Sequence, residues 1–135
     1  MTDPQPLYPH ELSVKRSLIA QHVLTVPEPE PPEDEVHSHR FTVEIQLAGP
    51  DLGEYDYLVD ITEVERIFEG LIERYRDSLL NDLPEFEGHN PSIERFSRVI
   101  ADRVAERLTD DTPDQLRVTV WEDETAWARY TRTLS

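Results

Sequence analysis

The segment EDEVHSHRFTVEIQL, residues 33–47, ends in a run in which apolar and polar residues alternate. Such alternation predicts a strand with one buried face, and the apolar positions are Phe41, Val43, Ile45 and Leu47. His37 and His39 have the same parity as these residues. If the strand extends back to them, both imidazoles point to one side of the sheet.

A second strand is predicted just before this segment. Residues 11–24, ELSVKRSLIAQHVL, also alternate, with Val14, Arg16, Leu18, Ala20 and His22 on one face. Residues 26–36 between the two strands are rich in proline and carboxylates, so they predict a loop rather than a helix or a paired strand. Residues 1–10 are punctuated by prolines and predict a flexible lead.

Two helices and two further strands follow. Asp60 can cap a first helix with Glu63 at the third position, and apolar residues recur at helical spacing from Ile61 to Tyr75. Asn90 and Pro91 suit the N-cap and first position of a second helix. Alternating residues then predict strands at 116–120 and 125–133, separated by a turn at 123–124. The pattern indicates one α+β domain over residues 11–135 with the order ββααββ.

The overall charge restricts the classes of partner. The chain of 135 residues has a formal net charge of -16, and Lys15 is its only lysine. Nucleic acid and anionic membranes are therefore disfavoured as partners, because they need a cationic surface. The composition suits a salt-adapted (halophilic) protein, and an ordinary acidic protein is the alternative. There is no cysteine and no apolar run long enough for a membrane span, which predicts a cytoplasmic protein without disulfides.

Three histidines are candidate metal ligands. His37 and His39, two residues apart on a strand, can bind one ion from the same face, and a hairpin across the acidic loop would bring His22 to them. Three histidines with a fourth position left for water or substrate are typical of catalytic zinc sites. The alternative is that the H-x-H pair is exposed beside a loop without binding a metal.

The order of several motifs resembles that of the 6-pyruvoyltetrahydropterin synthase and 6-carboxytetrahydropterin synthase family, over roughly residues 12–131. The family's phenylalanine-x-alanine-alanine-histidine motif corresponds to Leu18, Ala20, Gln21 and His22, and its H-G-H motif corresponds to His37, Ser38 and His39. Its methionine-valine-x-aspartate turn and its proline-threonine-x-glutamate helix start have counterparts here as well, at Leu58, Val59 and Asp60 and at Pro91, Ser92 and Glu94.

The resemblance implies a T-fold, in which a four-stranded antiparallel sheet has two helices on one face and subunits assemble into a barrel, as trimers or dimers of trimers. It also implies that His22, His37 and His39 hold Zn2+ at a site between subunits, where the metal polarises the side chain of a reduced pterin. Glu122 would anchor the pterin ring, and Ser92 and Glu94 would belong to the substrate-binding set.

The chain departs from the family where protons are transferred. Members typically use a cysteine before the H-G-H motif, and here Glu33 or Glu35 could replace it as the base. The family's aspartate-histidine pair aligns with Arg76 and Asp77, so Asp77 is a candidate carboxylate substitute, and His89 could contribute from elsewhere. Each of these residues is otherwise an ordinary surface group.

Two functions follow from the resemblance. The first is a zinc-dependent lyase acting on 7,8-dihydroneopterin triphosphate or a related reduced pterin, in tetrahydropterin, folate-like or deazaguanine (queuosine) pathways. The alternative is a non-catalytic homologue that keeps the fold and the metal or pterin site.

Overall fold

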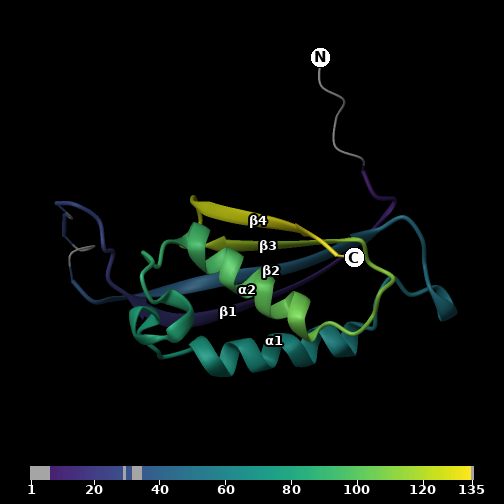
Figure 1. Cartoon of the computed structure of the whole chain (residues 1–135), viewed down its shortest axis with the longest axis horizontal. Coiled ribbons are helices and arrows are strands. Elements are labelled where there is room, and N and C mark those ends of the chain that lie inside the picture. The colour runs from purple at the N-terminus through teal and green to yellow at the C-terminus, as the bar shows by residue number, and fades with distance from the viewer. Residues whose placement is uncertain (1–6, 29, 32–34, 135) are drawn as a thin grey trace, which may run out of the picture.

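The computed structural model describes residues 7–28, 30–31 and 35–134, which form one four-stranded antiparallel sheet and two helices (Figure 1). The strands pair in the order β1-β2-β3-β4. The main elements are β1 (His10–His22), β2 (His37–Gly49), α1 (Ile61–Tyr75), α2 (Ile93–Arg107), β3 (Gln115–Trp121) and β4 (Trp127–Thr133). Short 3-10 turns are η1 (Glu54–Asp56), η2 (Leu80–Asp82) and η3 (Pro84–Phe86). The predicted ββααββ order is confirmed.

Both helices lie on the same face of the sheet. Helix α2 packs against β3 and β4, and α1 packs against β1 (Figure 1). The core between the layers includes an aromatic cluster in which the Phe96 ring lies 5.4 Å from Phe41 and 5.2 Å from Tyr75, between ring centroids. The alternating positions predicted for β2, from Phe41 to Leu47, are all buried in this core. None of the described helices is long and apolar enough to cross a membrane.

Strand β1 differs slightly from its predicted bounds. It begins at His10, which pairs with Gly49, and it ends at His22, which pairs with His37. The prediction extended the strand to Leu24. The pairing with β2 ends earlier because the backbone of Val23 bonds to the Asn81 side chain instead.

The start of α1 agrees with the prediction only in part. Asp60 is the N-cap, and its carboxylate accepts a hydrogen bond from the Thr62 amide at 2.9 Å. Glu63 does not complete a capping box. Its carboxylate accepts bonds from the amide and hydroxyl of Thr109, both at 2.7 Å, and so ties the start of α1 to the segment after α2.

The predicted start of α2 was wrong by two residues. Ser92 is the N-cap, because its hydroxyl accepts a hydrogen bond from the Arg95 amide, and the helix begins at Ile93. The Asn90 side chain accepts a bond from the Thr25 amide, which is why it does not cap the helix. Pro91 therefore precedes the helix rather than opening it.

Candidate metal centre

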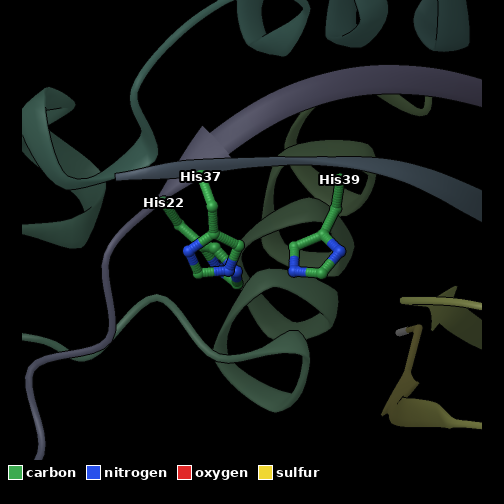
Figure 2. A group of neighbouring side chains, drawn as sticks. All are labelled: His22, His37 and His39. Atoms are coloured by element: carbon green, nitrogen blue, oxygen red, sulfur yellow. The ribbon is translucent and has the colours of Figure 1, made fainter. Parts of the chain in front are cut away.

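His22, His37 and His39 meet at one end of the sheet. The antiparallel register sets His22 directly across from His37, and Ala20 across from His39. All three side chains project to the same side of the β1–β2 hairpin, as Figure 2 shows. One possible ligand atom from each residue lies within 4.8 Å of the others. The parity and hairpin argument from the sequence thus predicted the arrangement of these side chains.

His22 is the buried member of the cluster, with a side chain only 1% exposed. Its Nδ1 donates a hydrogen bond to the carbonyl oxygen of Pro91 at 2.9 Å, since a carbonyl can only accept. The proton is therefore on Nδ1, and Nε2 presents a lone pair. Within the described part of the chain, this buried Nε2 has no hydrogen-bond partner.

The surroundings of His22 favour the neutral imidazole. Burial lowers its pKa below the usual value, the hydrogen bond to Pro91 opposes this effect, and the neighbouring imidazoles of His37 and His39 add to the lowering. A neutral imidazole is the form that binds metals. His22 is thus held as a ligand-competent base at neutral pH.

The other two histidines are more accessible. His37 donates from Nδ1 to the backbone carbonyl of Glu35 at 2.8 Å, so Nε2 is the ring nitrogen that can face a metal ion. His39 has a side chain 28% exposed, and its Nε2 lies 3.2 Å from Oε1 of Glu122. The cluster therefore runs from a buried base at His22 to a solvent-accessible one at His39.

These residues fit a divalent metal ion such as zinc. Zinc prefers imidazole nitrogen, and metal-binding histidines usually donate their second N–H to a carbonyl or carboxylate, as His22 and His37 do. The orphaned, buried Nε2 of His22 would gain a partner if a metal were bound. The three histidines therefore form a cluster that can bind a metal ion.

Glu122 lies beside this cluster, just after the end of β3. Its Oε1 is 3.2 Å from Nε2 of His39 and 3.9 Å from Nε2 of His22, and its side chain is 32% exposed. The turn after it is held by Asp123, whose carboxylate accepts bonds from the amides of Thr125 and Ala126. The turn predicted at 123–124 is confirmed, and the β3–β4 hairpin directs the Glu122 carboxylate toward the histidines.

Ser92 and Glu94 lie at a separate surface pocket. This pocket has a volume of about 400 Å3, and its lining includes both residues together with Arg95, Arg98 and Tyr130. The Ser92 hydroxyl is engaged in capping α2. None of His22, His37 and His39 lines this pocket.

Among the described residues, the candidate proton-transfer side chains are not part of the histidine cluster. Glu33 falls outside the described residues. Glu35 is exposed, and its backbone carbonyl, not its carboxylate, contacts His37. Asp77 is also exposed, has a positive φ of 56°, and bonds through its backbone amide to the carbonyl of Ile19 at 2.6 Å. His89 is exposed and lies outside the histidine cluster.

The sequence did not predict that the connection between α1 and α2 binds the backbone that follows β1. Asn81 bonds through its amide to both backbone groups of Val23, each at 2.9 Å, and Asn90 accepts a bond from the Thr25 amide at 2.8 Å. Asn81 was not among the residues predicted to be functional. Its contacts join segments 58 residues apart, which no local pattern reveals.

Glu85 is the centre of an ionic network in the same connection. Its carboxylate accepts bonds from both Arg74 and the Tyr75 hydroxyl, and it pairs with Arg103 at 2.9 Å. Burial alone would raise the pKa of Glu85, but the hydrogen bonds from Arg74 and Tyr75, with the charge of Arg103, outweigh it and lower the pKa to about 2. The network ties η3 to both helices.

The ββααββ order, the packing of both helices on one face of the sheet, and the three-histidine cluster at the end of the sheet define the class of protein. It is a T-fold protein with a potential metal centre. The chain belongs to the 6-pyruvoyl tetrahydropterin synthase family, because the model of that family matches residues 11–133. The family resemblance predicted from the motifs is confirmed.

Individual relatives agree with this assignment. The chain is 30% identical over 101 residues to the 6-carboxy-5,6,7,8-tetrahydropterin synthase of Bacillus subtilis, an alignment that covers 70% of this chain and 67% of the relative. Its fold is similar to that of 6-pyruvoyl tetrahydropterin synthase from Plasmodium vivax, with a TM-score of 0.76, 13% identity, and coverage of 92% of this chain and 98% of that one. The Caenorhabditis elegans enzyme gives a TM-score of 0.73 at 13% identity, covering 94% and 99%. Further solved structures of the Plasmodium vivax enzyme carry replacements of a catalytic glutamate.

Proposed function

We propose that the protein is a zinc-dependent lyase that acts on 7,8-dihydroneopterin triphosphate or a related reduced pterin. The observation that carries the proposal is the cluster of His22, His37 and His39, in which the buried Nε2 of His22 has no partner among the described residues. Family membership and the similarity to a 6-carboxytetrahydropterin synthase support pterin chemistry.

The three histidines would hold the metal through neutral imidazoles. His22 and His37 each donate their Nδ1 proton to a backbone carbonyl, so both offer Nε2. Bound zinc would supply Lewis acidity that makes the side-chain hydroxyls of the pterin more acidic. His39, with a side chain 28% exposed, lies on the side of the cluster nearest Glu122.

Glu122 is the proposed anchor of the pterin ring. A carboxylate can accept two hydrogen bonds from the paired N–H donors of an aminopyrimidinone, a charge-assisted and geometrically specific contact. Its Oε1 lies within 4 Å of two imidazoles, so the carboxylate must turn away from His39 to receive the ring. Ser92 and Glu94 are proposed to bind the substrate from the neighbouring pocket.

Proton transfer is assigned to carboxylates, since the chain has no cysteine. Glu33 and Glu35 are the proposed bases, with Asp77 as a further candidate. The hydrogen bond from His37 to the Glu35 carbonyl keeps residue 35 beside the cluster. A catalytic glutamate in the Plasmodium vivax enzyme is a precedent for a carboxylate in this family.

A non-catalytic homologue is the second candidate. The observation in its favour is Asp77, which stands where the resemblance expects an acid-base histidine and is exposed outside the histidine cluster. Such a protein would bind a metal and a reduced pterin without converting the pterin.

The proposal extends to the setting of the protein. We expect a cytoplasmic homo-oligomer, a trimer or a dimer of trimers, serving tetrahydropterin, folate-like or deazaguanine (queuosine) pathways. Sedimentation equilibrium of the zinc-loaded protein measures the assembly, and a monomer at micromolar concentration would contradict it.

The activity is tested by mass spectrometry of the products formed from 7,8-dihydroneopterin triphosphate by zinc-loaded protein in concentrated potassium chloride. His37→Ala should abolish both zinc binding and product formation. His10→Ala is the matched control, because it removes a histidine at the opposite end of β1. A new pterin formed by the wild type and the control identifies a lyase, and its side-chain mass identifies the reaction. Unchanged substrate, with zinc and pterin bound, would favour the non-catalytic alternative.

A further inference from the structure

We infer that the connection between α1 and α2, residues 76–92, positions the metal ligand His22, and that Asn81 is the main positioning residue. The inference rests on the proposed metal site and assigns a role to residues that lie outside it. Among the described residues, the Asn81 side chain makes its hydrogen bonds to Val23 and none to the three histidines or Glu122. It acts on His22 through the backbone of the next residue, Val23.

The end of β1 needs such support because the sheet stops holding it there. His22 is the last residue of β1 that pairs with β2, and the acidic, proline-rich segment follows. Strand ends without further partners open locally at little cost in free energy. A metal ligand at that position would lose its fixed orientation without another source of hydrogen bonds.

The connection supplies these bonds in sequence along β1. The amide of Asp77 donates to the carbonyl of Ile19, and the amide of Gln21 donates to the carbonyl of Ser78. The Asn81 side chain then both accepts from the Val23 amide and donates to the Val23 carbonyl. One side-chain amide thus reproduces the pair of bonds that a neighbouring strand would make.

The same connection also orients the His22 ring. The carbonyl of Pro91 accepts the Nδ1 proton at 2.9 Å, which sets both the tautomer and the rotation of the imidazole. Backbone and ring are therefore fixed from one segment. That segment is itself held to both helices by the Glu85 network with Arg74 and Arg103. Rigid support of this kind is what a metal ligand requires.

Asn81→Ala tests the inference because it removes the two bonds to Val23 without touching a histidine. Ser78→Ala is the control. It removes one bond within the connection, from the Ser78 hydroxyl to the Tyr75 carbonyl, and leaves the contacts of Val23 in place. Dissociation constants for Zn2+ and Co2+ are measured by chelator competition, together with the visible spectrum of the Co2+ protein, which reports coordination geometry.

We expect Asn81→Ala to bind both metals about 10- to 100-fold more weakly and to change the Co2+ spectrum. Ser78→Ala should keep the wild-type affinity and spectrum, even if its melting temperature falls equally. If Asn81→Ala does not fold, Asn81→Asp replaces it. This variant keeps the acceptor for the Val23 amide but sets a carboxylate oxygen against the Val23 carbonyl, so weaker metal binding is again expected.

The possible outcomes distinguish a failure of the positioning role of Asn81 from a failure of the proposed zinc site. Wild-type affinity and an unchanged Co2+ spectrum in folded Asn81 variants would overturn the positioning role alone. Failure of the wild-type protein to bind either metal would overturn the proposed zinc site, and the positioning role with it.

Discussion

At the scale of single residues, Glu85 and Glu122 show how two carboxylates acquire different roles from their surroundings. Glu85 has a side chain only 13% exposed and is surrounded by two arginines and a tyrosine hydroxyl. Glu122 is 32% exposed and faces imidazoles instead of cations. The first is therefore a structural anion, whereas the second is free to exchange partners.

Glu85→Gln should lower the free energy of unfolding by about 2–3 kcal/mol at pH 7, because it leaves the partly exposed Arg74 and Arg103 without their anion. The pKa of Glu85 is lowered from 4.5 to about 2, so its contribution is complete above pH 4.5 and is lost as the pH falls toward 2. Urea unfolding across this range should show the wild-type and variant curves converging at low pH. Glu87→Gln, an exposed neighbour, is the control. Parallel curves would contradict the assigned role.

Glu122→Gln separates pterin binding from metal binding. The variant keeps the size of the side chain but loses the charge, so we expect reduced-pterin affinity to fall about 10- to 100-fold, as for loss of a charge-assisted hydrogen bond. Zinc affinity should change little, since the three histidines remain. Pterin fluorescence titration and zinc competition measure the two affinities. Glu124→Gln in the same hairpin is the control, and equal pterin binding by both variants would refute the anchor.

At the scale of elements, three consecutive residues before α2 each make a different structural contact. Asn90 holds Thr25, the Pro91 carbonyl orients His22, and Ser92 caps the helix. The helix start is thus coupled to the metal centre by a single stretch of backbone. This division explains why the helix begins two residues later than the N-cap preference of asparagine suggests.

Ser92→Ala should destabilise the protein by about 1 kcal/mol, the usual effect of removing an N-cap side chain. Hydrogen exchange at the Arg95 amide should accelerate, because this amide loses its acceptor. Asn90→Ala is the comparison variant, and it should instead accelerate exchange at the Thr25 amide. Faster exchange at Arg95 in Asn90→Ala, but not in Ser92→Ala, would show that Asn90 is the functional cap.

At the scale of the whole molecule, negative charge is unevenly distributed. On its described strands, the face of the sheet opposite the helices carries two acidic residues, Glu11 and Glu44. The same face carries four cations: Lys15, Arg40, Arg117 and Arg129. Two of these cations lie over tryptophan rings, Lys15 at 4.6 Å from Trp121 and Arg129 at 4.8 Å from Trp127. The excess of acid therefore belongs to the rest of the surface, where like charges repel one another.

Salt should stabilise the protein through screening of this repulsion. We expect the melting temperature to rise by about 5 °C or more between low salt and molar potassium chloride, since the Debye length falls from about 10 Å at 0.1 M to about 3 Å at 1 M. Differential scanning calorimetry measures the change. Sodium chloride should act equally if screening is the cause. A constant or falling melting temperature would contradict salt adaptation and favour an ordinary acidic protein.

The order of elements and the faces of the strands were determined by the sequence alone. Strict alternation in residues 41–47 and helical spacing from Val64 to Tyr75 are local patterns, and burial in the core follows them directly. Ile61, which begins the same helical pattern, is 47% exposed. The three-histidine cluster was predictable for the same reason, because parity and a hairpin suffice to bring His22 to His37 and His39.

Only the tertiary structure decided which distant residues form hydrogen bonds with that cluster and with the backbone beside it. The partners of His22 and Val23 come from Pro91 and Asn81, across 69 and 58 residues of sequence. A separate tertiary contact accounts for the later start of α2, because the Asn90 side chain accepts a hydrogen bond from the Thr25 amide instead of capping the helix. Local patterns specify which face a residue occupies. Hydrogen bonds between distant segments specify its partner, and these depend on how the helices pack on the sheet.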